Sequence, residues 1–326
     1  MSFIGELSED KELLEGDGDI LIFGVEWGEK IYRNLLYYQK RKYITAFVDD
    51  KSSYHGKFLH GIPIISIKDA LERYRDIVIC IGGETDSKIG RVELLEGMRN
   101  VHKIAFNRNC HFLGTEYGGF YLPGSFEIEN AVVYSFGIGE DLSFSEAVIE
   151  GGGTVYAFDP TPKAIEYVEH HQLFSHPNFH FFSYGLSDED KKELFYLPVR
   201  DDWVSASVIS HQCVNKANAI EVEMKTLRTI MSELGHTHVD VLKMDIEGSE
   251  FKVVENIMNR DMGYVDLSLC VMELHGRFFG ALEREYVDKL YESMRNNGLY
   301  DLYGTNNEPT FIKMEKGDFK CSRYRK

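Results

Sequence analysis

A chain of 326 residues can bury a sizeable core and is long enough for two domains. Its formal net charge of −17 argues against a nucleic-acid partner, because proteins that bind a phosphate backbone gather Lys and Arg into a basic surface. The five cysteines are widely spaced, the acidic N-terminus lacks the pattern of a signal peptide, and no apolar run reaches the roughly 18 residues of a membrane span. We therefore expect a cytoplasmic protein with reduced thiols and no membrane span, and its oligomeric state stays open.

Residues 1–108 are predicted to form a small, parallel βα domain of Rossmann-like type. A strand at 19–23 leads through Gly24 and Gly28 into a helix from 29 to about 39, and a second strand at 43–48 ends in Asp49 and Asp50. The pattern then predicts a hairpin or extended excursion within 56–66, helices at 68–74 and 88–98, and strands at 76–81 and 101–106.

This first domain resembles the N-terminal nucleotide-sugar-binding-like half-domain of several sugar-modifying enzymes. The resemblance rests on Gly24, Gly28, Phe47-Val-Asp-Asp50 and Gly61-Ile-Pro-Ile. It implies a ligand site at the ends of the first two strands. The alternative is that the glycines only form tight turns and the two acids only cap the next element, since short glycine motifs are common.

Residues 109–130 have no clear hydrophobic period and mix glycine with aromatic residues between Gly114 and Gly124. Such a segment is either a plain linker or a flap whose rings cover a ligand in the next domain.

The second domain, residues 131–326, opens with a strand that ends in Gly137-Ile-Gly139 and leads into a helix at 142–150. A second strand at 154–158 ends in Asp159, about 20 residues beyond the glycines. This arrangement is typical of a nucleotide-binding α/β unit, in which glycines let the backbone approach a ligand and the acid accepts hydrogen bonds from ribose hydroxyls.

Further strands at 178–182, 239–245 and 267–272 alternate with helices, and a hairpin at 300–303 and 309–313 closes the pattern. We predict an α/β fold with a doubly wound, seven-stranded sheet. Ligands bind such sheets at the carboxyl ends of the strands. The polar residues and glycines expected there are Gly137, Gly139, Asp159, Gly185, Asp245, Glu247, Glu273 and His275.

The fourth strand of this domain carries the most informative run, Val241-Leu-Lys-Met-Asp-Ile-Glu-Gly-Ser-Glu250. It places Lys243 within an apolar strand, and burial of an unpaired ammonium is costly, so we expect a carboxylate partner nearby. Two acids, Asp245 and Glu247, follow at the end of the strand.

That run, together with Tyr134-Ser-Phe-Gly-Ile-Gly139, Ala157-Phe-Asp-Pro160 and Met272-Glu-Leu-His275, resembles the FkbM-type family of S-adenosylmethionine-dependent methyltransferases. The resemblance covers roughly residues 112–314 and implies the class I methyltransferase sheet. Ser135 stands where the family usually has an acid, and Glu140-Asp141 replace a third glycine.

The resemblance implies a set of cofactor contacts. Gly137 and Gly139, next to Ser135 and Phe136, would approach the methionine part of S-adenosylmethionine. Asp159 would hold the ribose, and Gly185 with Leu186 would border the adenine. Asp245 would receive the cofactor's ammonium or orient the substrate.

Two alternatives remain for proton removal from the acceptor. His275 is the first candidate for a general base, oriented by Glu273 or Glu247, although a histidine here can also simply bond the strand-end backbone. Alternatively, Asp245, Glu247, Glu273 and His275 bind a hard divalent ion that acidifies the acceptor hydroxyl.

We predict an O-methyltransferase that acts on a hydroxyl of a sugar, nucleotide sugar or glycan intermediate, as in polysaccharide biosynthesis. The first domain would bind the nucleotide-sugar end of the acceptor or a docking partner. The alternatives are a non-catalytic nucleotide-binding protein and a nicotinamide-dependent oxidoreductase. The absence of a complete Gly-x-Gly-x-x-Gly motif argues against the oxidoreductase.

Overall fold

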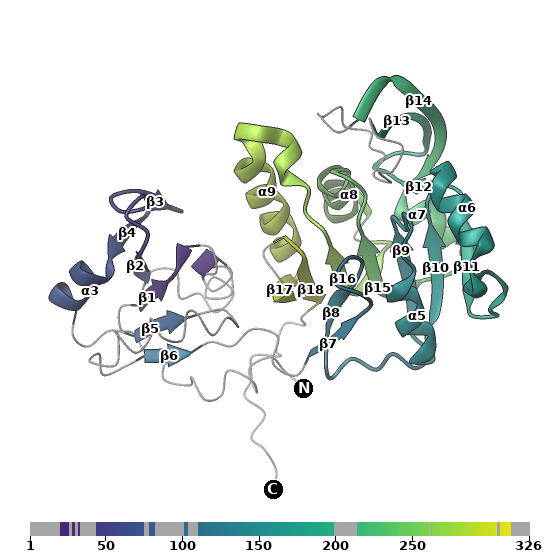
Figure 1. The fold of residues 1–326 in the computed structure, drawn as a ribbon. Helices are drawn as coiled ribbons and strands as arrows, with labels where there is room; N and C mark the ends of the chain where they lie inside the picture. Colours follow the sequence, from purple (N-terminus) through teal and green to yellow (C-terminus); the bar gives the residue numbers. More distant parts are fainter. Residues whose placement is uncertain are drawn as a thin grey trace, which may run out of the picture. The chain divides into compact units, whose positions relative to one another are not determined.

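The computed structural model describes residues 20–25, 28–29, 32, 44–74, 78–81, 101–103, 110–198, 214–261, 263–304 and 307–313 (Figure 1). These residues fall into two compact units, one that ends within the described residues at 103 and one that spans 110–313. None of the helices in the described ranges has the length and apolar character that a membrane span requires.

The first unit contains a six-stranded sheet in the order β3-β4-β2-β1-β5-β6. Neighbouring strands are parallel, except that β3 and β4 form an antiparallel hairpin. The predicted strands and the hairpin are confirmed, whereas the helix at 88–98 and most of the helix at 29–39 lie outside the described residues. The elements are β1 (Ile20–Phe23), β2 (Ile44–Asp49), β3 (Phe58–Leu59), β4 (Ile62–Ser66), α3 (Ile67–Arg73), β5 (Val78–Ile81) and β6 (Val101–Lys103).

Asp49, at the end of β2, is buried, and its carboxylate oxygens accept hydrogen bonds from backbone groups of the same unit. Its Oδ2 accepts a hydrogen bond from the backbone N–H of Val25 and its Oδ1 accepts one from that of Lys51, both at 2.8 Å. The carboxylate thus links the turn after β1 to the turn after β2. A ligand of this unit remains a prediction.

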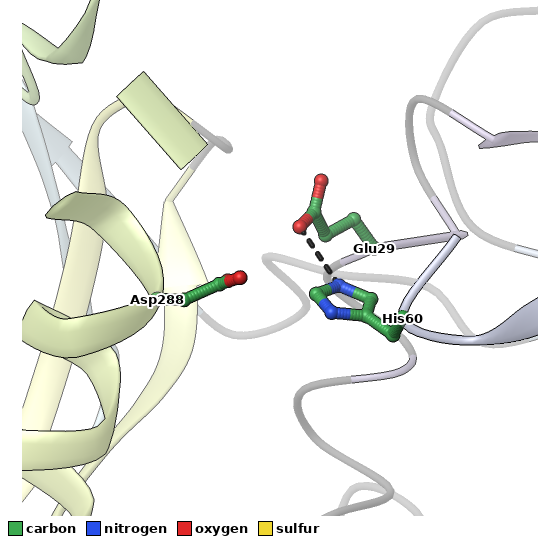
Figure 2. Close-up of side chains that lie close together, drawn as sticks. All are labelled: Glu29, His60 and Asp288. Atoms are coloured by element: carbon green, nitrogen blue, oxygen red, sulfur yellow. Dashed lines mark hydrogen bonds and ion pairs between the residues drawn. The ribbon is translucent and has the colours of Figure 1, made fainter. Parts of the chain in front are cut away.

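A second polar link in this unit joins the β3–β4 hairpin to the segment that follows β1. His60 Nε2 lies 3.0 Å from Glu29 Oε1 (Figure 2), and the imidazole stacks on Tyr32 with ring centroids 4.2 Å apart. The stacked, half-buried ring fixes the position of the hairpin against its own sheet.

The second unit contains a seven-stranded sheet in the order β11-β10-β9-β15-β16-β18-β17 (Figure 1). The first five strands in that order are parallel and β18 is antiparallel to both neighbours, so the predicted doubly wound sheet with a closing hairpin is confirmed. The strands are β9 (Val132–Phe136), β10 (Thr154–Phe158), β11 (Phe179–Phe182), β15 (His238–Met244), β16 (Asp266–Met272), β17 (Leu299–Gly304) and β18 (Pro309–Lys313).

Helices cover both faces of this sheet, because successive side chains of a strand point to opposite sides. Tyr134 and Leu242 belong to one apolar core with the buried side chains of α7 (Leu227–Leu234), α8 (Glu250–Asn256) and α9 (Glu283–Asn296). Val133 and Val241 belong to the other core, with those of α5 (Ser143–Glu150) and α6 (Pro162–His170). The near-continuous apolar sequence of the strands follows from burial on both faces.

The segment predicted as a linker or a flap begins with an antiparallel hairpin, β7 (Cys110–Leu113) and β8 (Phe120–Pro123). Phe120 and Leu122 are buried in the core that contains α5 and α6. This part of the segment therefore packs as an element of the second unit and holds its own turn, residues 114–119, in place.

A small second sheet follows β11 in the chain, in the order β12-β14-β13. Its strands are β12 (Gly185–Leu186), β13 (Lys191–Pro198) and β14 (Val214–Lys225). Trp203 and His211, in the polar excursion between them, lie outside the described residues.

Candidate active site

A pocket opens at the carboxyl ends of β9, β10 and β15, where a doubly wound sheet holds its ligands. It encloses about 890 Å³, the solvent at its mouth included. All eight residues that the sequence analysis assigned to cofactor contact line it, namely Ser135, Phe136, Gly137, Gly139, Asp159, Gly185, Leu186 and Asp245.

The turn after β9 brings two strand ends into direct contact. Gly137 has a φ of +77°, in the left-handed region, and a Cβ on it would overlap the backbone carbonyl oxygen of Asp245. Asp245 in turn donates its backbone N–H to the carbonyl of Phe136 at 3.0 Å. Glycine is thus required at 137 for the packing of β9 against the end of β15.

Asp159, at the end of β10, is buried and accepts four hydrogen bonds from the chain. Its Oδ2 accepts the backbone N–H groups of Ile138 at 2.8 Å and Gly139 at 3.1 Å. Its Oδ1 accepts the backbone N–H and the hydroxyl of Thr161 at 2.9 and 2.6 Å. The carboxylate therefore shapes the glycine turn, and contact with a ribose would have to replace or share these bonds.

Lys243 is buried at the pocket wall, with 5% of its surface exposed. Its ammonium donates to the carbonyl oxygens of Gly137 at 2.5 Å and Phe136 at 3.4 Å. Backbone carbonyls at the end of β9 accept these hydrogen bonds, and the carboxylates expected nearby, Asp245 and Asp159, act on the ammonium through their charge. Burial lowers the pKa of Lys243, and the nearby charges of Asp245 and Asp159 oppose that change.

His275, just beyond β16, lies among four carboxylates. Its Nδ1 is 3.0 Å from Glu250 Oε1, and its Nε2 is 3.4 Å from Glu247 Oε2, 3.5 Å from Glu273 Oε1 and 3.8 Å from Asp245 Oδ1. The imidazole is oriented by Glu250 rather than by Glu273 or Glu247, which corrects the sequence prediction. Glu250 is in the first turn of α8 and is fully buried.

Neighbouring carboxylates shift the pKa of the His275 imidazole. Burial by itself would lower the pKa of His275, but the hydrogen bond to Glu250 and the charges of Glu250, Glu247 and Asp245 outweigh it and raise the pKa to about 9. That pKa favours the protonated ring at neutral pH, so His275 must lose its Nε2 proton before this atom can accept another proton or bind an ion. The general-base role of His275 stays a prediction.

The β7–β8 turn contributes a residue that the sequence analysis did not select. Tyr117 lines the pocket, and partial burial of its phenol together with the charges of Asp245 and Glu247 raises its pKa, although the residue as a whole is largely exposed. The turn is tied to the start of α5, because Thr115 donates its hydroxyl to Asp141 Oδ2 at 2.8 Å and Asp141 Oδ1 accepts the backbone N–H of Ser143 at 2.7 Å. Asp141, which replaces a glycine of the family pattern, anchors this turn.

Other pocket residues were also absent from the predicted site. Three of them are buried and apolar, namely Phe158, Phe195 and Met224. Phe195 and Met224 belong to no sequence motif, so only their proximity in the folded chain marks them.

Comparison with known proteins agrees with this geometry. Residues 131–299, more than half of the chain, match the family described as the methyltransferase FkbM domain. The chain is 27% identical over 144 residues to the probable methyltransferase-like protein 24 of Homo sapiens, and 26% identical over 157 residues to that of Rattus norvegicus. These regions cover 44% and 48% of this chain and 32% and 36% of the relatives, so the chain spans about a third of their length.

Among solved structures, the fibrillarin pre-rRNA processing protein of Methanococcus jannaschii aligns with a TM-score of 0.36 and 12% identity, over 59% of this chain and 70% of that one. Residues 131–299 contain the glycine turn, Asp159 and the Asp245-Ile-Glu247 run at the pocket. By the match of these residues to the family pattern, the chain belongs to the FkbM methyltransferase family.

Proposed function

We propose that the second unit transfers a methyl group from S-adenosylmethionine to a hydroxyl group. The observation that carries this proposal is that Asp159 and Asp245, from separate strands, line one pocket together with Gly137. Had the two acids faced separate surfaces, no single site could hold both ends of the cofactor. Membership of the FkbM family supports the same reaction.

Residues that line the pocket suit the separate parts of S-adenosylmethionine. The buried apolar side chains of Leu186 and Met224, which line the pocket, suit an adenine ring. The amino-acid end of the cofactor carries an ammonium and a carboxylate. Lys243 and Asp245, two residues apart at the end of β15, present the complementary charges to the same pocket.

Methyl transfer requires alignment and the loss of one proton. S-adenosylmethionine, when bound, supplies an electrophilic methyl group on a positively charged sulfur. The chain must hold the acceptor oxygen in line with that methyl group and accept the hydroxyl proton. Glu247 lines the pocket and, with Glu273 and Asp245, offers carboxylate oxygens that can accept hydrogen bonds from the acceptor.

We further propose a sugar, nucleotide sugar or glycan as the acceptor. The proposal rests on the FkbM resemblance, and the carboxylates near the pocket suit an acceptor with several hydroxyl groups. A radiolabelled methyl-transfer screen over nucleotide sugars and glycans tests it, with label retained on a sugar as the expected result. Label on phenolic or amine acceptors alone would contradict the assignment.

Tyr117 offers a way to probe the acceptor side of the pocket. Because its side chain is 72% exposed, Tyr117→Ala should leave the melting temperature unchanged within about 1 °C. It should raise the KM for the acceptor by about tenfold through loss of one ring contact at the pocket. Steady-state kinetics with the acceptor found in the screen measure this effect, and an unchanged KM would remove the ring from the acceptor site.

Asp159→Asn is expected to weaken S-adenosylmethionine binding at least tenfold, measured by calorimetry. An amide keeps one acceptor for Thr161, but its NH₂ group cannot accept from the N–H groups of Ile138 and Gly139, so the glycine turn loses its anchor.

Asp49→Asn is a matched control, because Asp49 accepts equivalent backbone bonds at the end of β2 in the other unit. It should leave S-adenosylmethionine affinity unchanged. A loss of affinity in Asp49→Asn but not in Asp159→Asn would move the cofactor site to the first unit. Binding of NAD in place of S-adenosylmethionine would favour an oxidoreductase.

A further inference from the structure

The cluster that consists of Asp245, Glu247, Glu273 and His275 has a spacing that hydrogen bonding does not explain. The carboxylate oxygens lie 3.4, 3.5 and 3.8 Å from His275 Nε2, which is longer than an ordinary N–H···O bond. Asp245, Glu247 and His275 each offer one ligand atom, and these three atoms lie within 4.8 Å of one another. The acids thus face Nε2 at ion-pair distance rather than at hydrogen-bond distance.

A shared cation accounts for these distances. Ligand atoms about 2.1 Å from one ion are about 3.0 Å apart at right angles and about 4.2 Å apart on opposite sides. The separations of 3.4–3.8 Å from His275 Nε2 fall within that interval. A small inward movement of the partly exposed carboxylates would complete the coordination.

The imidazole provides a second observation, independent of the acids. The ring is 1% exposed and stacks on Phe278, with centroids 5.3 Å apart. Glu250 Oε1 holds its Nδ1 and also accepts the backbone N–H of Ile246 at 2.9 Å. Within the part of the chain that the structure describes, Nε2 has no hydrogen bond and is aimed among the three carboxylates. A carboxylate that fixes one ring nitrogen while the other faces the ion is common in metal sites. The ion would displace the proton that the apo ring carries on Nε2, as metal binding to histidine requires.

The charges around His275 also favour a bound cation. Four carboxylates surround one imidazole, and Glu250 Oε2 is buried with no hydrogen-bond partner among the described residues. Arg277 reaches Glu273 at 3.5 Å, whereas the ammonium of Lys243 is directed to Gly137. A bound cation would offset part of the negative charge that these acids bring to the imidazole.

We propose that Asp245 and Glu247, together with His275 Nε2, bind one divalent transition-metal ion beside the methyl-transfer pocket. A mixed set of imidazole and carboxylates suits Mn²⁺ or Fe²⁺ better than Mg²⁺, which favours oxygen ligands alone. The role of the ion rests on the proposed function. Asp245 and Glu247 also line the pocket, so the ion would bind the acceptor hydroxyl and lower its pKa.

Manganese binding tests the site without any methyl transfer. The full chain, freed of metal by a chelator and dialysed, is titrated with Mn²⁺, and the electron paramagnetic resonance signal of free Mn²⁺ is followed. We expect one site per chain with a dissociation constant in the micromolar range. Loss of one ligand in His275→Gln should weaken binding at least tenfold.

His238→Gln is the matched control. His238 also lies between carboxylates, with Nδ1 2.9 Å from Asp266 and Nε2 3.3 Å from Asp240, but at the opposite ends of β15 and β16. It should bind Mn²⁺ like the parent protein. If His275→Gln does not fold, as circular dichroism would show, Glu247→Gln removes a partly exposed ligand instead and should weaken binding by a similar factor.

The outcomes separate this inference from the proposed function. Absence of Mn²⁺ binding to the folded protein at millimolar concentration, or binding unchanged in both His275→Gln and Glu247→Gln, would overturn the ion site. S-adenosylmethionine binding, measured separately on the metal-free protein, tests the methyltransferase proposal. A protein that binds the cofactor but no Mn²⁺ keeps that function without the ion.

Discussion

Lys243→Met is expected to weaken S-adenosylmethionine binding by about 10- to 100-fold, because a hydrogen bond to a charged group contributes about 1.5–3 kcal/mol. Lys243 is the buried cation of the pocket wall, and its ammonium lies against the glycine turn that is expected to meet the amino-acid end of the cofactor. Methionine keeps most of the side-chain volume but removes the charge. Calorimetric titration of the full chain with S-adenosylmethionine measures the change.

The same substitution should change the melting temperature by only a few degrees. Removal of the ammonium leaves the carbonyls of Phe136 and Gly137 without this donor, but it also removes the cost of keeping a charge in an apolar strand. Lys252→Met is the control, because Lys252 lies on α8 and pairs with Glu193 and Asp188 at the surface. Equal cofactor affinity in Lys243→Met and the parent protein would contradict the assigned role.

The strands and helices of the second unit were predictable because the sequence patterns that mark them are local. Apolar runs of strand length, alternating with amphipathic helices, predict the parallel strands, and the Asn130–Glu150 and Lys243–Glu250 runs locate their carboxyl ends. Since all parallel strands end at one edge, the position of a residue along its own strand was enough to bring Gly137, Asp159 and Asp245 to one pocket.

The partners of the ionisable groups were not predictable in the same way. Glu250 meets His275 only because α8 packs against the end of β16, and nothing local to either residue reports that contact. Lys243 was expected to pair with an acid, yet the positive φ at Gly137 turns a backbone carbonyl toward it. Asp159 likewise turns to the N–H groups of Ile138 and Gly139. Each pairing depends on backbone geometry at a turn, which residue type alone does not determine.

Gly137→Ala is expected to be among the most destabilising single substitutions in the second unit, with a loss of at least about 3 kcal/mol in the free energy of unfolding. Alanine in the left-handed region costs about 1–2 kcal/mol by itself. The added Cβ would also overlap the carbonyl oxygen of Asp245, and that oxygen belongs to the backbone, so the ends of β9 and β15 would have to separate.

Gly235→Ala distinguishes backbone strain from this overlap. Gly235, at the C-terminus of α7, has a φ of +73°, close to the +77° of Gly137, but a Cβ on it would meet no atom within 4 Å. It should therefore cost only about 1 kcal/mol, a shift of about 2–4 °C in melting temperature for a unit of this size, against at least about 6 °C for Gly137→Ala. Similar shifts in the two variants would mean that strain at the turn, and not contact between the strand ends, requires glycine at 137. In that case the ends of β9 and β15 could separate in solution, and the pocket that depends on their contact would be less rigid than the structure indicates.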